Sequence, residues 1–223
     1  MVQKKKRKIT KRQKQRIIVE SIILFLALVG AITLVVLAAK GIRALFDNNK
    51  VVEEMPEMDV ELLTVNDYSR PGIALDEVNA IVIHYTANPG TTAIQNRNYF
   101  EGLKDSQETR ASSHFIIGLD GEIVQCIPTQ EISYASNDRN NDSIAIECCH
   151  PDDTGQFNDS TYNTLIHLTA WLCGKYGLTT EDVIRHYDIT GKDCPKYYVE
   201  NEDAWKQFLK DVDDYIDEYG VKQ

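Results

Sequence analysis

The longest apolar stretch of the chain is SIILFLALVGAITLVVLAA at positions 21–39, which contains no charged side chain. A helix rises about 1.5 Å per residue and a bilayer core is about 30 Å thick, so this stretch predicts a transmembrane helix over residues 17–40. Nine Lys or Arg residues at positions 4–16 precede it, which places residues 1–16 in the cytoplasm and the remainder outside. A cleaved signal peptide has the same order of segments but a shorter apolar core. We therefore expect a single-pass protein of the cell membrane.

The hydrophobic pattern after this stretch predicts a tether followed by one domain. Residues 41–70 are rich in acids and show no sustained helical or alternating period, so we interpret them as a tether. Residues 71–223 are enough for one domain with its own core. Within them, short β-branched runs alternate with helical patterns, which predicts an α/β fold with a mixed central sheet flanked by helices. Strands are expected at 80–84, 114–118, 122–127, 143–147 and 183–186, and helices at 91–103, 159–176 and 202–219.

Charge divides the chain in the same place. The formal net charge is −10, but residues 1–40 hold ten basic residues and one acid, so the remainder carries a net charge of −19. A domain this acidic has no basic stripe, which argues against binding to nucleic acid. The five cysteines are an odd number, so at least one is free, bound to a metal or paired with another chain. Cys126 could pair with Cys148 or Cys149, and the sequence leaves this open.

Three of the predicted strands end in residues that can bind a metal or work beside one: His84, Glu147 and His186. A polar residue at the end of a buried strand lies at the edge of the sheet, where a cleft can form. Each one alone is more often an ordinary polar residue. The segment RHYDITGKDCP adds Lys192 and the thiol of Cys194 within eight residues of His186. Two imidazoles and one thiolate leave a fourth tetrahedral position for water, which is typical of catalytic zinc sites.

Four segments in register carry a resemblance to a known family. They are IVIHYTANPG, ASSHFIIGLDGEIVQCIP, NDSIAIECC and VIRHYDITGKDCP. In order and spacing they resemble the zinc-dependent type 2 N-acetylmuramoyl-L-alanine amidases of the phage-lysozyme and peptidoglycan-recognition-protein superfamily. The resemblance covers about residues 70–215 and implies the amidase fold.

The resemblance also implies roles for individual residues. His84, His186 and Cys194 correspond to the ligands of one Zn²⁺ per chain. Glu147 is expected to act as the general base, and Lys192 to help polarise the scissile carbonyl. The phage-lysozyme branch has a Tyr where this chain has Ser113, so Glu147 must carry more of the Tyr's role.

The implied function is that of a peptidoglycan hydrolase. It cleaves the amide bond between N-acetylmuramic acid and the L-alanine of the stem peptide with zinc-activated water. The alternatives are a non-catalytic or regulatory muropeptide-binding module on the same fold, and a scaffold with a vestigial site. Non-catalytic relatives typically lack the Cys ligand, so Cys194, Lys192 and Glu147 together favour catalysis. The expected partners are peptidoglycan and muropeptides, and the membrane through the N-terminal helix, while no obligate protein partner is evident.

Further residues near these motifs are candidates for contact with the stem peptide. They lie in predicted loops and are Tyr85, Thr86, Asn88, Asn137 and Arg139. His114 shares a strand face with Ile116, and its role is either structural or in substrate contact. Arg185 alternates away from His186 along its strand and is expected to pair with an acid within the fold.

Overall fold

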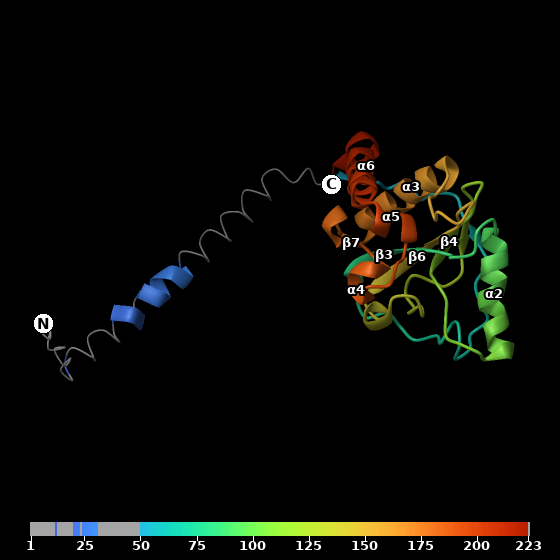
Figure 1. The fold of residues 1–223 in the computed structure, drawn as a ribbon, viewed down its shortest axis with the longest axis horizontal. Coiled ribbons are helices and arrows are strands. Elements are labelled where there is room, and N and C mark those ends of the chain that lie inside the picture. The colour runs from blue at the N-terminus through green and yellow to red at the C-terminus, as the bar shows by residue number, and fades with distance from the viewer. Residues whose placement is uncertain (1–11, 13–19, 23, 31–49, 223) are drawn as a thin grey trace, which may run out of the picture. The chain divides into compact units, whose positions relative to one another are not determined.

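The computed structural model describes residues 12, 20–22, 24–30 and 50–222 (Figure 1). The chain divides into two units, Met1–Asn48 and Asn49–Gln223. The second unit contains the whole of the predicted α/β domain.

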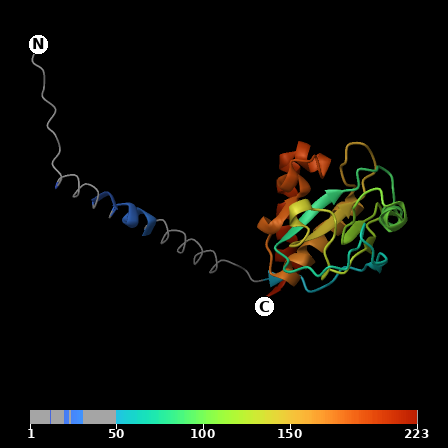
Figure 2. The ribbon, with the colours of Figure 1, turned by 90° about the horizontal axis from the view of Figure 1, so that it is seen from below.

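A six-stranded sheet forms the centre of this domain (Figure 2). Its strands, in spatial order, are β2 (Asp59–Val60), β5 (Ile123–Gln125), β4 (Phe115–Ile117), β6 (Ser143–Cys148), β3 (Ala80–Tyr85) and β7 (Val183–Arg185). Strands β4 and β5 are antiparallel and form the hairpin predicted at Asp120 and Gly121, and the other neighbours are parallel. The prediction of a mixed α/β sheet is therefore confirmed.

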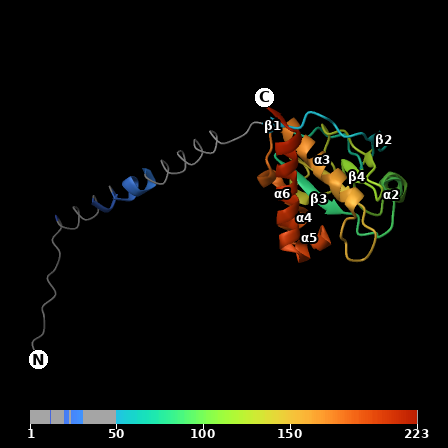
Figure 3. The same ribbon diagram turned by 90° about the horizontal axis from the view of Figure 1, so that it is seen from above.

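Helices cover both faces of the sheet. On one face, α3 (Asp159–Tyr176) and α6 (Glu202–Tyr219) pack beside each other over the larger hydrophobic core (Figures 1 and 3). On the other face, α2 (Ala93–Ser106) packs in a smaller core that includes Phe100, Leu103 and Ile116. The shorter elements are β1 (Lys50–Val51), η1 (Asn137–Arg139), η2 (Thr180–Asp182), α4 (His186–Thr190), α5 (Lys196–Glu200) and β8 (Val221–Lys222).

The bounds of α3 follow from its end residues. The Asn158 side chain accepts a hydrogen bond from the backbone N–H of Thr161 at 2.9 Å, which satisfies a donor that the first turn would otherwise leave free. Gly177 ends the helix in the left-handed conformation, with φ 66°, which glycine adopts without strain. The predicted bounds of α3 and α6 are confirmed.

Side-chain alternation along two parallel strands brings the candidate site to one face. Ile81 and Ile83 of β3 lie in the core under α3 and α6, as do Ile144 and Ile146 of β6. Because successive strand residues point to opposite faces, His84 and Glu147 point to the face that α2 covers. The two residues are direct neighbours in the β3–β6 register.

Residues 50–70 differ from the tether predicted for 41–70, because they pack as part of the compact domain. Strand β1 pairs with β8 near the end of the chain, and β2 extends the central sheet beside β5. Val52 and Leu63 are buried, at 4% and 1% exposure. The domain therefore includes residues N-terminal to position 71.

The predicted transmembrane helix, residues 17–40, lies largely outside the described residues. The described part of that range is helical at residues 20–22 and 24–30. A bilayer span needs about 20 predominantly apolar helical residues, and no helix in the described part of the chain has that length and character. This finding contradicts the predicted location in the cell membrane, and it does not support the expected contact with the membrane.

All five cysteines are free and buried. The disulfide that the sequence left open, between Cys126 and Cys148 or Cys149, is therefore not formed.

Candidate metal centre

Two imidazoles and a thiol converge at the end of the sheet. His84 comes from β3, His186 is the first residue of α4, and Cys194 lies in the loop after α4. All three are buried, and their candidate ligand atoms lie within 4.8 Å of one another. The Cys194 Sγ atom lies 3.7 Å from His84 Nδ1, and the centroids of the two imidazole rings are 4.7 Å apart.

A short helix, not the predicted strand end, presents His186. The carboxylate of Asp188 accepts the backbone N–H of Arg185 at 2.8 Å, which starts α4 directly after β7. Gly191 ends α4 with φ 76°, and the returning loop is fixed where the backbone N–H of Tyr187 donates to Cys194 O at 2.9 Å. This reversal places the Cys194 thiol beside the two histidines.

The three side chains fit a bound cation. Imidazole nitrogen and thiolate sulfur are the ligands that Zn²⁺ prefers, and a sulfur and a nitrogen bound to one tetrahedral zinc lie roughly 3.6 Å apart. The Sγ–Nδ1 distance of 3.7 Å between Cys194 and His84 agrees with that separation.

Burial sets the protonation of these groups in the absence of a cation. Burial, with the charges of His186 and Lys192, lowers the pKa of His84 well below its usual value. Burial and Lys192 also lower the pKa of His186, so both rings are neutral at pH 7 and keep a lone pair for a metal. Burial raises the pKa of Cys194 to about 12, while the backbone N–H of Tyr85, a hydrogen-bond donor to the thiol, opposes the rise. A bound cation would offset that cost by stabilising the thiolate.

The second nitrogen of each imidazole contacts a polar side chain from one turn. His186 Nε2 lies 2.8 Å from Asn137 Oδ1, and His84 Nε2 lies 3.3 Å from Ser136 Oγ. The turn therefore contacts Nε2 of both rings and leaves Nδ1 of each ring without a contact to it.

Glu147 and Lys192 lie at the same cavity. Glu147 is half-buried, and its Oε2 atom is buried without a hydrogen-bond partner in the described part of the chain. Burial raises the pKa of Glu147 to about 8, and the charge of Lys192 partly opposes the rise. Lys192 itself is exposed. The site therefore combines a carboxyl group with a raised pKa, the ammonium group of Lys192 and three possible metal ligands.

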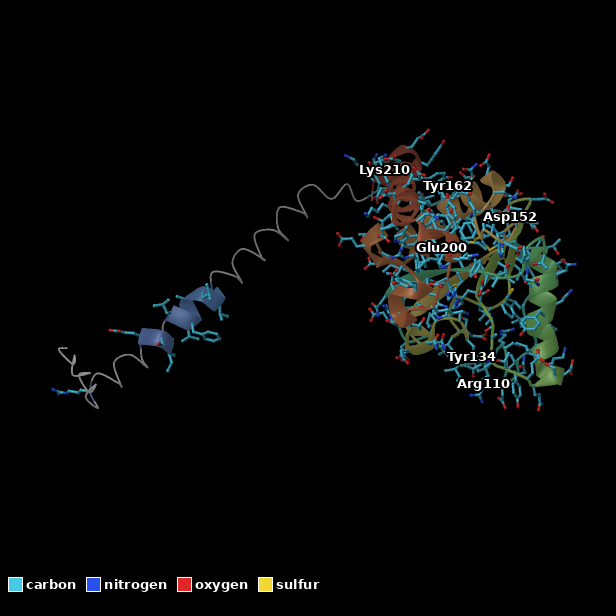
Figure 4. All side chains as sticks on the ribbon, viewed as in Figure 1. Arg110, Tyr134, Asp152, Tyr162, Glu200 and Lys210 are labelled. Carbon is cyan, nitrogen blue, oxygen red and sulfur yellow. The ribbon has the colours of Figure 1, made fainter. Side chains whose placement is uncertain are left out.

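These residues line a cavity of about 330 Å³. Its wall also includes Arg110 and Tyr134, which lie side by side at one edge of the domain (Figure 4). The Arg110 guanidinium carbon is 5.7 Å from the centre of the Tyr134 ring, a cation–π distance. The remaining lining residues are Phe100, Ala111, Ser112, Ala135, Asn140, Tyr85 and Asn137.

Only some of the predicted substrate-contact residues lie at the cavity. Tyr85 and Asn137 line the cavity, whereas Thr86, Asn88 and Arg139 are not part of its wall. Thr86 donates its backbone N–H to Cys148 O, and the Asn88 carbonyl accepts the Thr91 hydroxyl at 2.6 Å in a tight turn. Arg139 donates to Asp142 at 2.7 Å.

His114 has a structural environment. Its ring is fully buried, with Nδ1 accepting the backbone N–H of Ala145 at 3.0 Å and Nε2 lying 2.9 Å from Glu131 O. Both nitrogens are thus engaged by backbone, and burial lowers the pKa of His114 to about 4. Of the two roles left open by the sequence, these contacts match the structural one.

Arg185 pairs with acids, as its strand position predicts. It contacts Asp188 at 2.9 Å and Glu202 at 2.7 Å, and it also donates to Tyr198 O. These contacts connect β7 and α4 to α5 and α6, which fixes the backbone next to His186.

Ser136 and Asn140 are among the residues at the site that were not singled out from the sequence. Ser136 contacts His84, and Asn140 lines the cavity. The available signal was the density of Ser, Asn and Asp in the segment SNDRNND, which is typical of a turn with many side-chain acceptors. Which of these acceptors reaches an imidazole depends on tertiary structure.

The fold and the site together define a class of protein: a mixed α/β domain with a candidate metal centre at the end of its sheet. The profile of the Amidase_2 family, described as N-acetylmuramoyl-L-alanine amidase, matches residues 74–197, which is more than half of the chain. The chain therefore belongs to the N-acetylmuramoyl-L-alanine amidase family.

Individual relatives agree with this assignment. The N-acetylmuramoyl-L-alanine amidase CwlL of Bacillus licheniformis is 36% identical over 165 residues, covering 68% of this chain and 45% of that protein. The amidase BlyA of Bacillus subtilis (strain 168) is 34% identical, over 67% of this chain and 45% of that protein. The solved structure of a mutant endolysin from Bacillus subtilis superposes with a TM-score of 0.60 at 26% identity, covering 71% of this chain and 99% of that one. The chain thus spans about half the length of the curated relatives it matches.

Proposed function

We propose that this domain hydrolyses the amide bond between the lactyl group of N-acetylmuramic acid and L-alanine, and so releases the stem peptide from the glycan of peptidoglycan. Membership of the amidase family supports the choice of bond. The observation that carries the proposal is the convergence of His84, His186 and Cys194 with Glu147 and Lys192 in one cavity.

The proposed cofactor is one Zn²⁺ held by His84, His186 and Cys194. The neutral imidazoles and the buried thiol supply the nitrogen and sulfur ligands of catalytic zinc sites, which keep one coordination position open. When bound, zinc supplies polarisation of the scissile carbonyl and lowers the pKa of water to near 7.

The general base in this proposal is Glu147. Glu147 lines the cavity, and its Oε2 has no hydrogen-bond partner among the described residues, so the carboxylate is available to take a proton from the attacking water. The water oxygen forms a bond to the carbonyl carbon, the C–N bond breaks, and Glu147 returns the proton to the departing amine of L-alanine. Burial raises the pKa of this carboxyl to about 8, which is close to neutral pH. A group with such a pKa can both accept and donate a proton efficiently.

Lys192 stabilises the negative charge that develops on the carbonyl oxygen. Lys192 lines the same cavity, and among the described residues its Nζ has no hydrogen bond that would hold it elsewhere. Tyr85 at the end of β3 lines the cavity, which supports its role in substrate contact.

The alternative is a module that binds muropeptides without cleaving them. The presence of Glu147 and Lys192 beside the three possible ligands favours hydrolysis, since binding alone needs neither a base nor an oxyanion partner.

Mass spectrometry of fragments released from purified peptidoglycan tests the proposal. We expect stem peptides with a free L-alanine amine, and no release after removal of metal with a chelator. Release of glycan fragments with the stem peptide still attached, or of nothing, would contradict hydrolysis of this bond.

A further inference from the structure

The turn formed by residues 134–142, which precedes β6, contacts both histidines of the candidate metal centre. Ser136 Oγ lies 3.3 Å from His84 Nε2, and Asn137 Oδ1 lies 2.8 Å from His186 Nε2. Two consecutive residues of one turn therefore reach the outer nitrogens of both rings.

The direction of these hydrogen bonds decides which ring nitrogen carries the proton. Asn137 Oδ1 can only accept, so His186 Nε2 must donate and Nδ1 keeps its lone pair. A hydroxyl can accept as well, so Ser136 permits the same tautomer for His84, whose Nδ1 lies 3.7 Å from Cys194 Sγ. With these tautomers Nδ1 of each ring is unprotonated, and Nδ1 of His84 lies beside the Cys194 thiol.

Asn140 holds this turn in shape. Its side-chain Oδ1 accepts the backbone N–H groups of Ala135 at 3.0 Å and of Ser136 at 2.6 Å. Its own backbone N–H donates to Asn137 O at 3.1 Å. The Asn140 side chain thus accepts hydrogen bonds from backbone N–H groups that have no helix or strand partner in this irregular segment.

The turn is also fixed at its two ends. Tyr134 exchanges hydrogen bonds with Ser112, through its backbone N–H at 2.9 Å and its carbonyl at 3.1 Å. The hydroxyl of Ser143, the first residue of β6, donates to Arg139 O at 2.6 Å.

Within the turn, Asn137 adopts the left-handed backbone conformation, with φ 52°. Asn tolerates this region better than most residues, yet a non-glycine residue there needs support from its surroundings.

We propose that Ser136, Asn137 and Asn140 form a positioning unit for the metal centre. Asn140 sets the shape of the turn, and Ser136 and Asn137 hold the two imidazoles in the tautomer and orientation that present Nδ1 to the cation. This inference rests on the proposed function, because it concerns the ligands of the zinc proposed there. Partners of this kind typically contribute 10- to 100-fold to metal affinity.

Zinc affinity, measured by competition with a chelator, tests the unit on the full chain. We expect Asn137→Ala and Asn140→Ala to weaken zinc binding about 10- to 100-fold. Asn137→Asp should bind zinc at least as tightly as the wild type, because a carboxylate accepts the same hydrogen bond from His186. Asn141→Ala is the matched control, since Asn141 is an exposed residue of the same turn, and its affinity should not change.

A second readout separates positioning from a general loss of structure. In the metal-free protein, ¹⁵N NMR of the imidazoles should show His186 protonated at Nε2 in the wild type and in Asn137→Asp, and a mixture of tautomers in Asn137→Ala. Circular dichroism and thermal unfolding check that each variant folds.

Each outcome bears on a different claim. A wild-type protein that binds zinc while folded Asn137→Ala and Asn140→Ala bind it equally well would overturn this inference and leave the proposed function standing. A proton on Nδ1 of His186 in the wild type would also overturn it. A wild-type protein that binds no zinc would overturn the proposed function, and this inference with it.

Discussion

Replacing Glu147 by Gln isolates the proton-transfer step from metal binding. Gln has the same size and keeps an acceptor oxygen, but it cannot take a proton from water. Glu147 is not one of the three converging ligand residues, so zinc affinity should stay within about threefold of the wild type.

The expected loss of rate follows from the contacts of Glu147. A positioned general base contributes about 10²- to 10⁴-fold, and Glu147 Oε2 has no other partner in the described part of the chain to share that role. Lys192 remains at the cavity in the variant. We therefore expect kcat to fall about 10³-fold, equivalent to about 4 kcal/mol of transition-state stabilisation.

The assay follows kcat on a soluble muropeptide, with zinc content measured by mass spectrometry on the same preparations. Glu108→Gln is the control, because Glu108 is an exposed carboxylate outside the cavity wall. A Glu147→Gln enzyme with near-normal kcat would refute the base assignment. A variant that lost zinc together with activity would instead show that Glu147 helps to bind the metal.

Three further changes give expected outcomes. Cys194→Ala should lose zinc and activity together while the domain remains folded, since the thiol is one of three ligands; zinc content and circular dichroism check this, and a zinc-replete Cys194→Ala protein would contradict it. Burial holds the folded pKa of His114 at about 4 against the usual 6.5, so its contribution to stability is complete above pH 6.5 and is lost as the pH falls through 4. Chelator-treated wild type should therefore lose about 2–3 kcal/mol more than His114→Gln between pH 7 and pH 4.5 in denaturant unfolding, and equal losses would exclude His114 as the cause. Arg185→Gln should lower the free energy of unfolding by about 2 kcal/mol, because the charge-assisted bonds from the buried Arg185 guanidinium to Asp188 and Glu202 are lost. An unchanged midpoint in the same assay would show that these pairs contribute nothing.

The parts of the fold that the sequence predicted are those that local signals control. The apolar period, the Asn158 cap and the Gly177 stop define α3 without reference to the rest of the chain. The alternation in AIVIH and SIAIE likewise places His84 and Glu147 on one face of the sheet.

The remaining features depend on contacts between distant segments. Residues 50–70 have no period of their own, because β1 and β2 are two-residue strands that form only against β8 and β5. His186 belongs to α4 because the Asp188 side chain caps the start of that helix. The short β-branched run before His186 predicts instead that the strand continues to it. No local pattern predicts that Ser136 reaches His84, 52 positions away in the sequence.

X-ray absorption spectroscopy of the zinc-loaded full chain tests the central claim most directly. The account predicts one zinc per chain bound by one sulfur at about 2.3 Å and two imidazole nitrogens at about 2.0–2.1 Å, with the sulfur signal absent in Cys194→Ala. A zinc without a sulfur ligand in the wild type, or a wild-type chain that binds no zinc, would contradict it.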